Sequence, residues 1–197
     1  GPIVATHSRV NLTLLRNGTK LTLNVPLTLA CAFGVELGNA DIVNSYSDGR
    51  RVLITRGMMK FTRSDQELAY ILGTEMAHNA LAHAHRQKMS ATISGVIDNL
   101  ILIHPDQTML GGTGGIKTYS ADQDASAYTL GLYMVARAGY DTSQAAAFWR
   151  RLAAEYPPSI TSGYTAIHPS TVNQLAVISK ANNEIKTLQS AKKPLLP

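Results

Sequence analysis

Residues 63–83 read RSDQELAYILGTEMAHNALAH, and the rest of the fold is best approached from this stretch. Ser64 is followed three residues later by Glu67, the capping-box pattern in which each side chain accepts a hydrogen bond from a backbone amide at a helix start. The apolar residues that follow recur at helical spacing, at Leu68, Ile71, Leu72 and Met76. The sequence therefore predicts a helix that begins after Ser64.

The polar residues of this helix have the spacing of part of a zinc site. In H-E-x-x-H zinc peptidases, two imidazoles on one helix face bind the metal and the intervening glutamate acts as the base. Here the matching residues are Thr74, Glu75 and His78, so the first imidazole is replaced by a threonine. Spacing alone does not identify a site, because Glu and His three residues apart are common as an ordinary pair on a helix surface.

Other patterns predict the remaining elements. Residues 10–15 and 20–25 alternate apolar and polar around Asn17-Gly18, the strongest short signal of a β-hairpin. A short strand is expected at residues 51–55. Further helices are expected over 89–103, from the Ser120 and Gln123 capping box to about 137, from Asp141 to about 155, and from Pro169 to about 188.

These elements predict an α+β fold, mainly helical with a small β-sheet, preceded by a β-hairpin. The expected divisions are a hairpin segment at residues 1–30, a main domain at 31–189 and a frayed tail at 190–197. Residues 111–118 are rich in glycine, but Ile116 separates the glycines from Lys117-Thr118, so we interpret them as a surface loop or lid and not as a phosphate-binding loop.

Composition limits the possible functions. The chain has 197 residues, 45% hydrophobic and 16% charged, which suits a globular domain with a sizeable core. Basic residues gather in residues 50–63, but they are spread through a strand and a turn. We interpret them as a solvated face and expect no nucleic-acid partner. No apolar run reaches the roughly 18 residues of a membrane span, so none is expected.

The single cysteine, Cys31, excludes an internal disulfide framework and is expected to be a small buried hydrophobic residue. The opening Gly1-Pro2 is typical of a protease-cleavage scar, so any targeting segment is expected to be absent from this sequence. His7 and His104 are interpreted as surface or locally bonded residues.

Several blocks together resemble one family. They are residues 44–59, 64–69 and 73–79, then 120–131 with 136–141, and finally Ile167-His168-Pro169-Ser170-Thr171. In this order they resemble the HtpX-like and BepA-like zinc metalloendopeptidases, the gluzincins of peptidase family M48, over roughly residues 40–185. The resemblance implies a gluzincin metallopeptidase-like domain, with the hairpin as the possible end of a preceding PDZ-like module.

The resemblance also implies what this chain lacks. The family's third zinc ligand is a Glu in an E-A-D triplet, and the chain has Ser126-Ala127-Tyr128 there. An Arg usually follows the family's His-Pro segment six residues after the His, and this chain has Gln174. Structural zinc binding is worth about 10 to 16 kcal/mol shared over about four ligands, so the loss of an imidazole and a carboxylate costs several kcal/mol each.

By this resemblance, Glu75 is a vestigial general base and His78 a vestigial metal ligand, with Thr74 and Ser126 as substituted ligand positions. Asn79, Tyr128 and His168 are expected to line the cleft. His168 is expected close to His78 with no metal between them, bonded to Glu75, or else as a cap of the last helix.

Neighbouring residues are candidates for a replacement metal site. His83 lies five residues after His78, which on a continuous helix places the two on different faces, and His85 is expected at or beyond the helix end. Asp122, one turn before Ser126, is the residue expected to be able to offer a carboxylate towards His78. No spacing forces three ligands together.

The sequence therefore favours a degenerate peptidase that is non-catalytic, needs no cofactor and binds an extended peptide or unfolded protein segment, with the strand at 51–55 as the binding edge. The alternative is an active zinc metalloendopeptidase with an altered ligand set. A structural part of a larger envelope assembly is a third possibility. Family resemblance implies an extracytoplasmic or periplasmic location. Thr74→His alone is not expected to restore activity, because Ser126 leaves the site one ligand short.

Overall fold

The computed structural model describes residues 9–27, 32–101, 115–160, 162–169 and 171–197. The chain divides into two compact units, Gly1–Ala32 and Phe33–Pro197, which are described separately. Cys31, His7 and His104 lie outside the described residues, as does the part of the predicted glycine-rich loop before residue 115.

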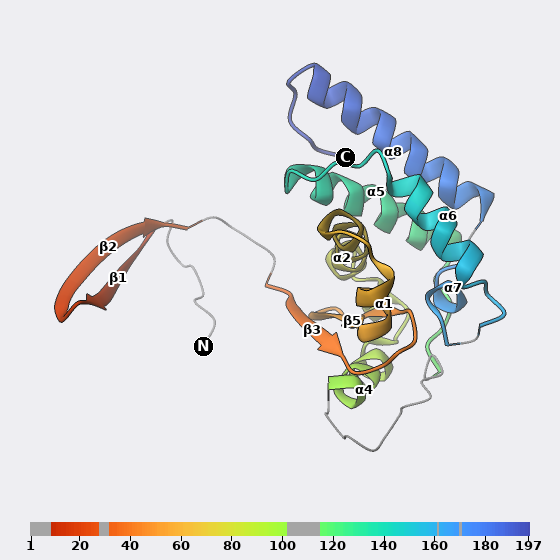
Figure 1. Cartoon of the computed structure of the whole chain (residues 1–197), viewed down its shortest axis with the longest axis horizontal. Helices are drawn as coiled ribbons and strands as arrows, with labels where there is room; N and C mark the ends of the chain where they lie inside the picture. The colour runs from red at the N-terminus through yellow and green to blue at the C-terminus, as the bar shows by residue number, and fades with distance from the viewer. Residues whose placement is uncertain (1–8, 28–31, 102–114, 161, 170) are drawn as a thin grey trace. The chain divides into compact units, whose positions relative to one another are not determined.

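The first unit is a β-hairpin, as predicted (Figure 1). Strands β1 (Arg9–Arg16) and β2 (Thr19–Pro26) pair antiparallel. Between them Asn17 and Gly18 both have positive φ, 51° and 78°, the backbone geometry that a two-residue type I′ turn requires. The assignment of this hairpin to a PDZ-like module stays a prediction.

The second unit contains a three-stranded sheet of β3 (Gly34–Gly38), β4 (Ser45–Ser47) and β5 (Arg51–Thr55). Their order is β3-β5-β4, with β3 parallel and β4 antiparallel to β5. The predicted strand at residues 51–55 is present, but its role as a peptide-binding edge is wrong because β5 is paired on both sides. Among the described strands, β3 and β4 form the edges.

The helices of this unit are α1 (Arg56–Phe61), α2 (Asp65–Ala80), α3 (His83–Arg86), α4 (Ser90–Ile101), α5 (Ala121–Arg137), α6 (Ala145–Glu155), α7 (Tyr164–Ile167) and α8 (Val172–Ser190). The predicted class, α+β and mainly helical with a small sheet, is confirmed. Within the described ranges no helix is both long and apolar enough to cross a bilayer.

Two predicted helix starts are confirmed. The Ser64 side chain accepts a hydrogen bond from the Glu67 amide, although the Glu67 carboxylate accepts from the amide of Arg63 and not from that of Ser64. At α5 the Ser120 and Gln123 capping box is complete in both directions. These caps depend on residues only three positions apart, so local sequence was sufficient to find them.

Two other predicted starts are wrong. Asp141 does not open α6, because its carboxylate accepts from the Ser143 amide in a local turn, and α6 begins only at Ala145. Pro169 does not begin the last helix either. Thr171 is the N-cap of α8, and its hydroxyl accepts from the Gln174 amide.

Helices α2 and α5 cross at Gly73 and Gly131, where the two helix backbones are in direct contact. A Cβ atom on Gly73 would lie 2.8 Å from the carbonyl oxygen of Gly131, and one on Gly131 would lie 2.8 Å from the Gly73 carbonyl carbon. Side chains at these positions would therefore force the helices apart. This close approach brings the first half of α5 next to the last turns of α2, and it positions the site described below.

Two apolar clusters make up the interior of the second unit. The larger packs α2, α5, α6 and α8 around residues such as Phe148 and Ile178. The smaller packs α4 against the sheet and includes Ile97, Ile116 and Ile167. Leu195, in the segment after α8, packs against the larger cluster.

Candidate functional site

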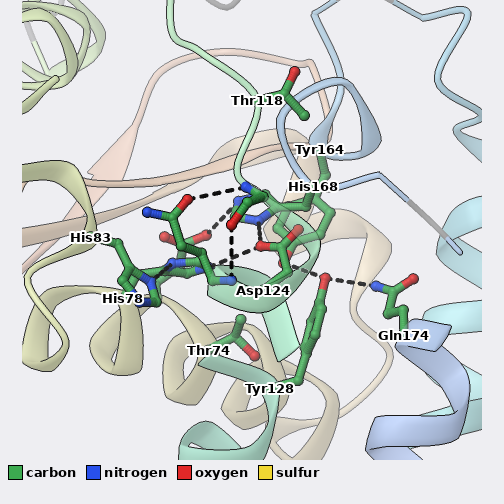
Figure 2. A network of polar contacts seen from close by, with 12 residues as sticks. Thr74, His78, His83, Thr118, Asp124, Tyr128, Tyr164, His168 and Gln174 are labelled. Atoms are coloured by element: carbon green, nitrogen blue, oxygen red, sulfur yellow. Dashed lines mark hydrogen bonds and ion pairs between the residues drawn. The ribbon is translucent and has the colours of Figure 1, made fainter. Parts of the chain in front are cut away.

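Four buried polar residues from three parts of the chain meet in one cluster, and Figure 2 labels three of them, His78, Asp124 and His168. Glu75 and His78 come from α2, Asp124 from the first turn of α5, and His168 from the residue after α7. All four are at most 4% exposed to solvent. We refer to Glu75, His78, Asp124 and His168 as the polar cluster.

His168 lies between the two carboxylates. Its Nδ1 is 2.8 Å from Asp124 Oδ1 and its Nε2 is 3.5 Å from Glu75 Oε1. Burial alone would lower the pKa of His168, but the two carboxylates outweigh it and raise the pKa to about 9. Burial would likewise raise the pKa of Glu75 and of Asp124, yet each is lowered by its imidazole neighbours, chiefly His168.

His78 contacts both Asp124 and His83. Its Nε2 is 3.4 Å from Asp124 Oδ1, and its Nδ1 is 2.8 Å from His83 Nδ1. Burial lowers the pKa of both imidazoles, that of His83 to about 4. In a neutral pair one Nδ1 must donate and the other accept, so this contact ties the tautomer of His78 to that of His83.

The expectation that His78 and His83 point to different faces is wrong. It assumed one continuous helix, but α2 ends at Ala80 and Ala82 has a left-handed backbone with φ of 55°. The chain therefore reverses, and α3 begins at His83 with its side chain directed back to His78.

Thr74 is buried one turn before His78 and is satisfied without any ligand. Its hydroxyl donates to the carbonyl oxygen of Tyr70 at 2.9 Å, along its own helix. At this position the helix therefore provides a side chain bonded to its own backbone and no imidazole.

The structure does not bring Ser126 into the polar cluster. Ser126 is exposed, and its hydroxyl is within hydrogen-bonding distance of the carbonyl oxygens of Asp122 and Gln123. Asp122 is exposed as well, so the carboxylate that reaches His78 belongs to Asp124 instead. Asp124 was missed, although one signal could have found it. It falls on the helix face that carries Tyr128 and Gly131, which is the buried face of α5.

The other expected cleft residues lie in different surroundings. The Asn79 amide donates to the Arg51 carbonyl and accepts from the Gly49 amide, so it joins α2 to the first residue of β5 and to the turn before it. Tyr128 is buried beside the cluster, and its hydroxyl accepts from Gln174 Nε2 at 2.6 Å. Two positions at which the sequence departs from the family pattern, 128 and 174, thus form one hydrogen-bonded unit.

Aromatic rings cover the imidazoles. The ring of Tyr119 stacks on His78 and on His168, with centroid distances of 4.1 and 4.8 Å, and Tyr164 stacks on His168 at 4.2 Å. Tyr119 is held in place by its backbone amide, which donates to the Ile167 carbonyl. The crevice beside Glu75 that Tyr119 helps to line has no room for a water-sized sphere. The cluster is therefore closed on the side of Glu75. Sequence reasoning did not identify Tyr119.

The polar cluster has the donor atoms of a metal site. One ligand atom each from His78, Asp124 and His168 lie within 4.8 Å of one another. Among the described residues, His78 Nε2, His168 Nε2 and Glu75 Oε2 are buried without a hydrogen-bond partner. The contacts of His78 Nε2 with Asp124 at 3.4 Å and of His168 Nε2 with Glu75 Oε1 at 3.5 Å lack hydrogen-bond geometry. Two imidazoles and one carboxylate are the protein ligands of some catalytic zinc sites. The donor set is therefore that of a three-ligand site for a divalent cation, and His168 would have to lose the proton that its raised pKa retains before it could bind the ion.

Comparison with known proteins identifies the family. A putative beta-barrel assembly-enhancing protease from Vibrio cholerae serotype O1 is 28% identical over 123 residues, which cover 55% of this chain and 25% of that protein. The chain thus spans about a quarter of the length of that relative. The sequence profile of peptidase family M48 matches residues 22–182. Because this match covers most of the 197 residues, the chain belongs to peptidase family M48.

Proposed function

We propose that this domain is a non-hydrolytic member of its family that binds an extended polypeptide segment beside the polar cluster. The observation that carries the proposal is Thr74, which stands where an H-E-x-x-H helix has its first imidazole and whose hydroxyl is bonded to Tyr70. A zinc site deprived of one imidazole loses several kcal/mol of the roughly 10 to 16 that structural zinc binding provides.

The charges of the cluster support the same proposal. Both ring nitrogens of His168 face carboxylates, at 2.8 Å from Asp124 and 3.5 Å from Glu75. These contacts let the side chains of the cluster balance much of one another's charge. Buried carboxylates need such partners, and His168 supplies one from the chain itself.

Edge strand β4 supports the peptide-binding part. An extended peptide can add to a sheet edge through main-chain hydrogen bonds. Strand β4 is an edge among the described strands, and it lies against the cluster because the Ser45 hydroxyl donates to Glu75 Oε1 at 2.7 Å. Tyr119 lines the crevice between β4 and His168, so a peptide that binds there displaces Tyr119.

The test uses dye-labelled, unfolded casein and the protein purified without chelator. We expect saturable binding by fluorescence anisotropy and no cleavage on gels, with or without added zinc. Absence of binding would overturn the proposal, and so would cleavage that a chelator abolishes.

The second candidate is a zinc metalloendopeptidase with an altered ligand set, and the three clustered ligand atoms of His78, Asp124 and His168 favour it. A divalent cation held by these residues would supply Lewis-acid chemistry. Glu75 would act as the base, since Ser45 holds its Oε1 while its Oε2 has no partner among the described residues.

Metal content separates the two candidates. Stoichiometric zinc after purification without chelator, together with chelator-sensitive cleavage, would favour the enzyme. In that case Asp124→Ala should remove both the metal and the cleavage. The matched control is Asp122→Ala, which removes an exposed carboxylate of the same helix and should change neither.

We also propose an extracytoplasmic location in the cell envelope. The support is the relative from Vibrio cholerae, which is named for beta-barrel assembly. The test is fractionation of the source cells with an antibody against this domain. Recovery with periplasmic or envelope markers is expected, and recovery only with cytoplasmic markers would contradict the proposal.

A further inference from the structure

The two ring nitrogens of His78 have different surroundings. Its Nε2 lies 3.4 Å from Asp124 Oδ1 and has no hydrogen-bond partner among the described residues. Its Nδ1 lies 2.8 Å from His83 Nδ1, and Figure 2 shows the two side chains together. His78 therefore has Nε2 available for a cation beside Asp124 and His168, while Nδ1 is occupied by the contact with His83.

Binding through Nε2 requires one particular tautomer of His78. A neutral imidazole that offers the lone pair of Nε2 carries its proton on Nδ1. That proton points to His83 Nδ1, which must then accept it, so the proton of a neutral His83 lies on its own Nε2. In the opposite arrangement His83 Nδ1 donates, the proton of His78 lies on Nε2, and this nitrogen has no lone pair for a cation.

The backbone around His83 holds its ring in this place. His83 is 3% exposed and is the first residue of α3, directly after the left-handed Ala82. The Ala82 amide donates to the Asn79 carbonyl and the Ala82 carbonyl accepts from the Arg86 amide, both at 3.0 Å. The contact between the two imidazoles therefore depends on a hydrogen-bonded turn, and not on a long side chain that is free to move.

We propose that His83 is a positioning residue of the cation site: it accepts the Nδ1 proton of His78 and so keeps His78 Nε2 ready to bind a divalent cation. The proposal rests on the ligand set of the second candidate function. Histidines that bind metals almost always donate their other ring N–H to an acceptor, and removal of such a partner typically lowers metal affinity about 10- to 100-fold. His83 is this acceptor for His78.

The first experiment compares the zinc affinities of the native protein, His83→Asn and His83→Leu by competition with a chromophoric chelator. The side-chain oxygen of asparagine can accept the proton in place of Nδ1, so His83→Asn should bind zinc within about threefold of the native affinity. Leucine has no acceptor, and His83→Leu should bind about 10- to 100-fold more weakly. If His83 only fills space, the order is reversed, because the buried site then tolerates leucine better than asparagine.

Two further comparisons control for the substitution of a buried residue. His85→Leu changes the exposed histidine of the same helix and should leave the zinc affinity unchanged. The other pair keeps His83 and changes the turn. Glycine adopts the φ of 55° at Ala82 without strain, so Ala82→Gly should keep the native affinity. Valine is strongly disfavoured at that φ, so Ala82→Val should displace His83 and weaken zinc binding as His83→Leu does.

NMR of the imidazole nitrogens in the zinc-loaded protein reads the tautomers directly. We expect the proton of His78 on Nδ1 and that of His83 on Nε2. A zinc-loaded His78 with its proton on Nε2 would overturn the proposal, and so would a native zinc affinity in His83→Leu. If the native protein binds no zinc, this proposal and the second candidate function are overturned together, whereas the proposed binding of polypeptide is not affected.

Discussion

At the scale of single residues, we expect the side chain at position 74 to affect how well the cluster holds a cation. Thr74→His would add an imidazole one turn before His78, as a fourth donor beside His78, Asp124 and His168. Four ligands sharing about 10 to 16 kcal/mol contribute about 3 kcal/mol each, and we expect zinc affinity to rise roughly 100-fold. Competition with a chromophoric chelator measures this change.

Ser126→His is the matched control for this prediction. It adds an imidazole on α5, but Ser126 is exposed and bonded to its own helix, so zinc affinity should stay unchanged. Tighter zinc binding by Ser126→His without any gain from Thr74→His would show that the ligand positions have been assigned to the wrong residues.

Asp124 and Ser126 also show where sequence reasoning failed at the residue scale. Two residues on a helix of 3.6 residues per turn point about 200° apart, so an assignment to 126 places the ligand on the solvent side of α5. The sequence contained the correct carboxylate, two positions earlier. The face that Asp124 shares with Tyr128 and Gly131 was a local signal for it, but the contact of this face with α2 depends on tertiary packing.

A second residue-scale prediction concerns Glu67 and Arg151. The Arg151 guanidinium donates to both oxygens of Glu67 at 2.7 Å, and these hydrogen bonds lower the pKa of Glu67 from its usual 4.5 despite partial burial. Because the pKa of Glu67 is lower in the folded than in the unfolded protein, the pair stabilises the fold fully at pH values above the unfolded-state pKa. That stabilisation is lost as the pH falls through the folded-state pKa. The unfolding temperature should therefore fall as the pH is lowered below about 4.5.

At pH 7 the variant Glu67→Gln should be about 1.5 to 3 kcal/mol less stable than the native protein and should unfold at a lower temperature. Between pH 5 and 3 it should lose less stability than the native protein loses. Calorimetry across this pH range gives the measurement. Glu184→Gln is the control, since its contact with Lys180 is a 3.9 Å pair in solvent and should contribute little. Identical pH profiles for the native protein and Glu67→Gln would refute the role of the pair.

At the scale of elements, the approach of α2 and α5 depends on Gly73 and Gly131. Gly131→Ala places a Cβ 2.8 Å from the Gly73 backbone, where no side chain can move aside. Overpacking of this kind costs about 1 to 3 kcal/mol, and here it also moves Asp124 away from His78. We expect a lower midpoint in urea denaturation.

The same substitution at Gly95 should raise stability, whereas Gly131→Ala should lower it. Gly95 lies within α4, and nothing is within 4 Å of the position that its Cβ would occupy. Alanine there should stabilise the helix by about 0.5 to 1 kcal/mol. If Gly131→Ala proves as harmless as Gly95→Ala, the contact between the two helices cannot be as close as described.

Elements were predictable where their signals are local. The caps at Ser64 and Ser120 and the turn at Asn17-Gly18 are each specified by residues at most three positions apart, and all are present. The reversal at Ala82 was not predictable, because alanine rarely takes a positive φ. In the structure the Ala82 amide donates to the Asn79 carbonyl and the Ala82 carbonyl accepts from the Arg86 amide. That reversal brings His83 to His78, so the sequence could not indicate the contact between them.

At the scale of the whole second unit, the polar cluster lies between the two apolar clusters. Helices α2 and α5 pack in the larger one, whereas Ile116 and Ile167, which flank the crevice beside Glu75, belong to the smaller one. On the proposed peptide binding at β4, a polypeptide that enters past Ile116 and Ile167 requires this side to move, so the stability of the smaller cluster should set how often the site opens there.

Hydrogen exchange can test this division. Ile97 and Ile178 are both fully buried, one in the smaller cluster and one in the larger. Ile97→Ala should lose about 2 to 5 kcal/mol of packing and speed amide exchange mainly in α4 and residues 115–119, with a smaller effect on α2. Ile178→Ala should speed exchange in α2 and α5 as well. Mass spectrometry of the peptic fragments resolves these regions. An equal increase across all of them in Ile97→Ala would mean that the unit opens only as a whole, and access to the polar cluster would then require global unfolding.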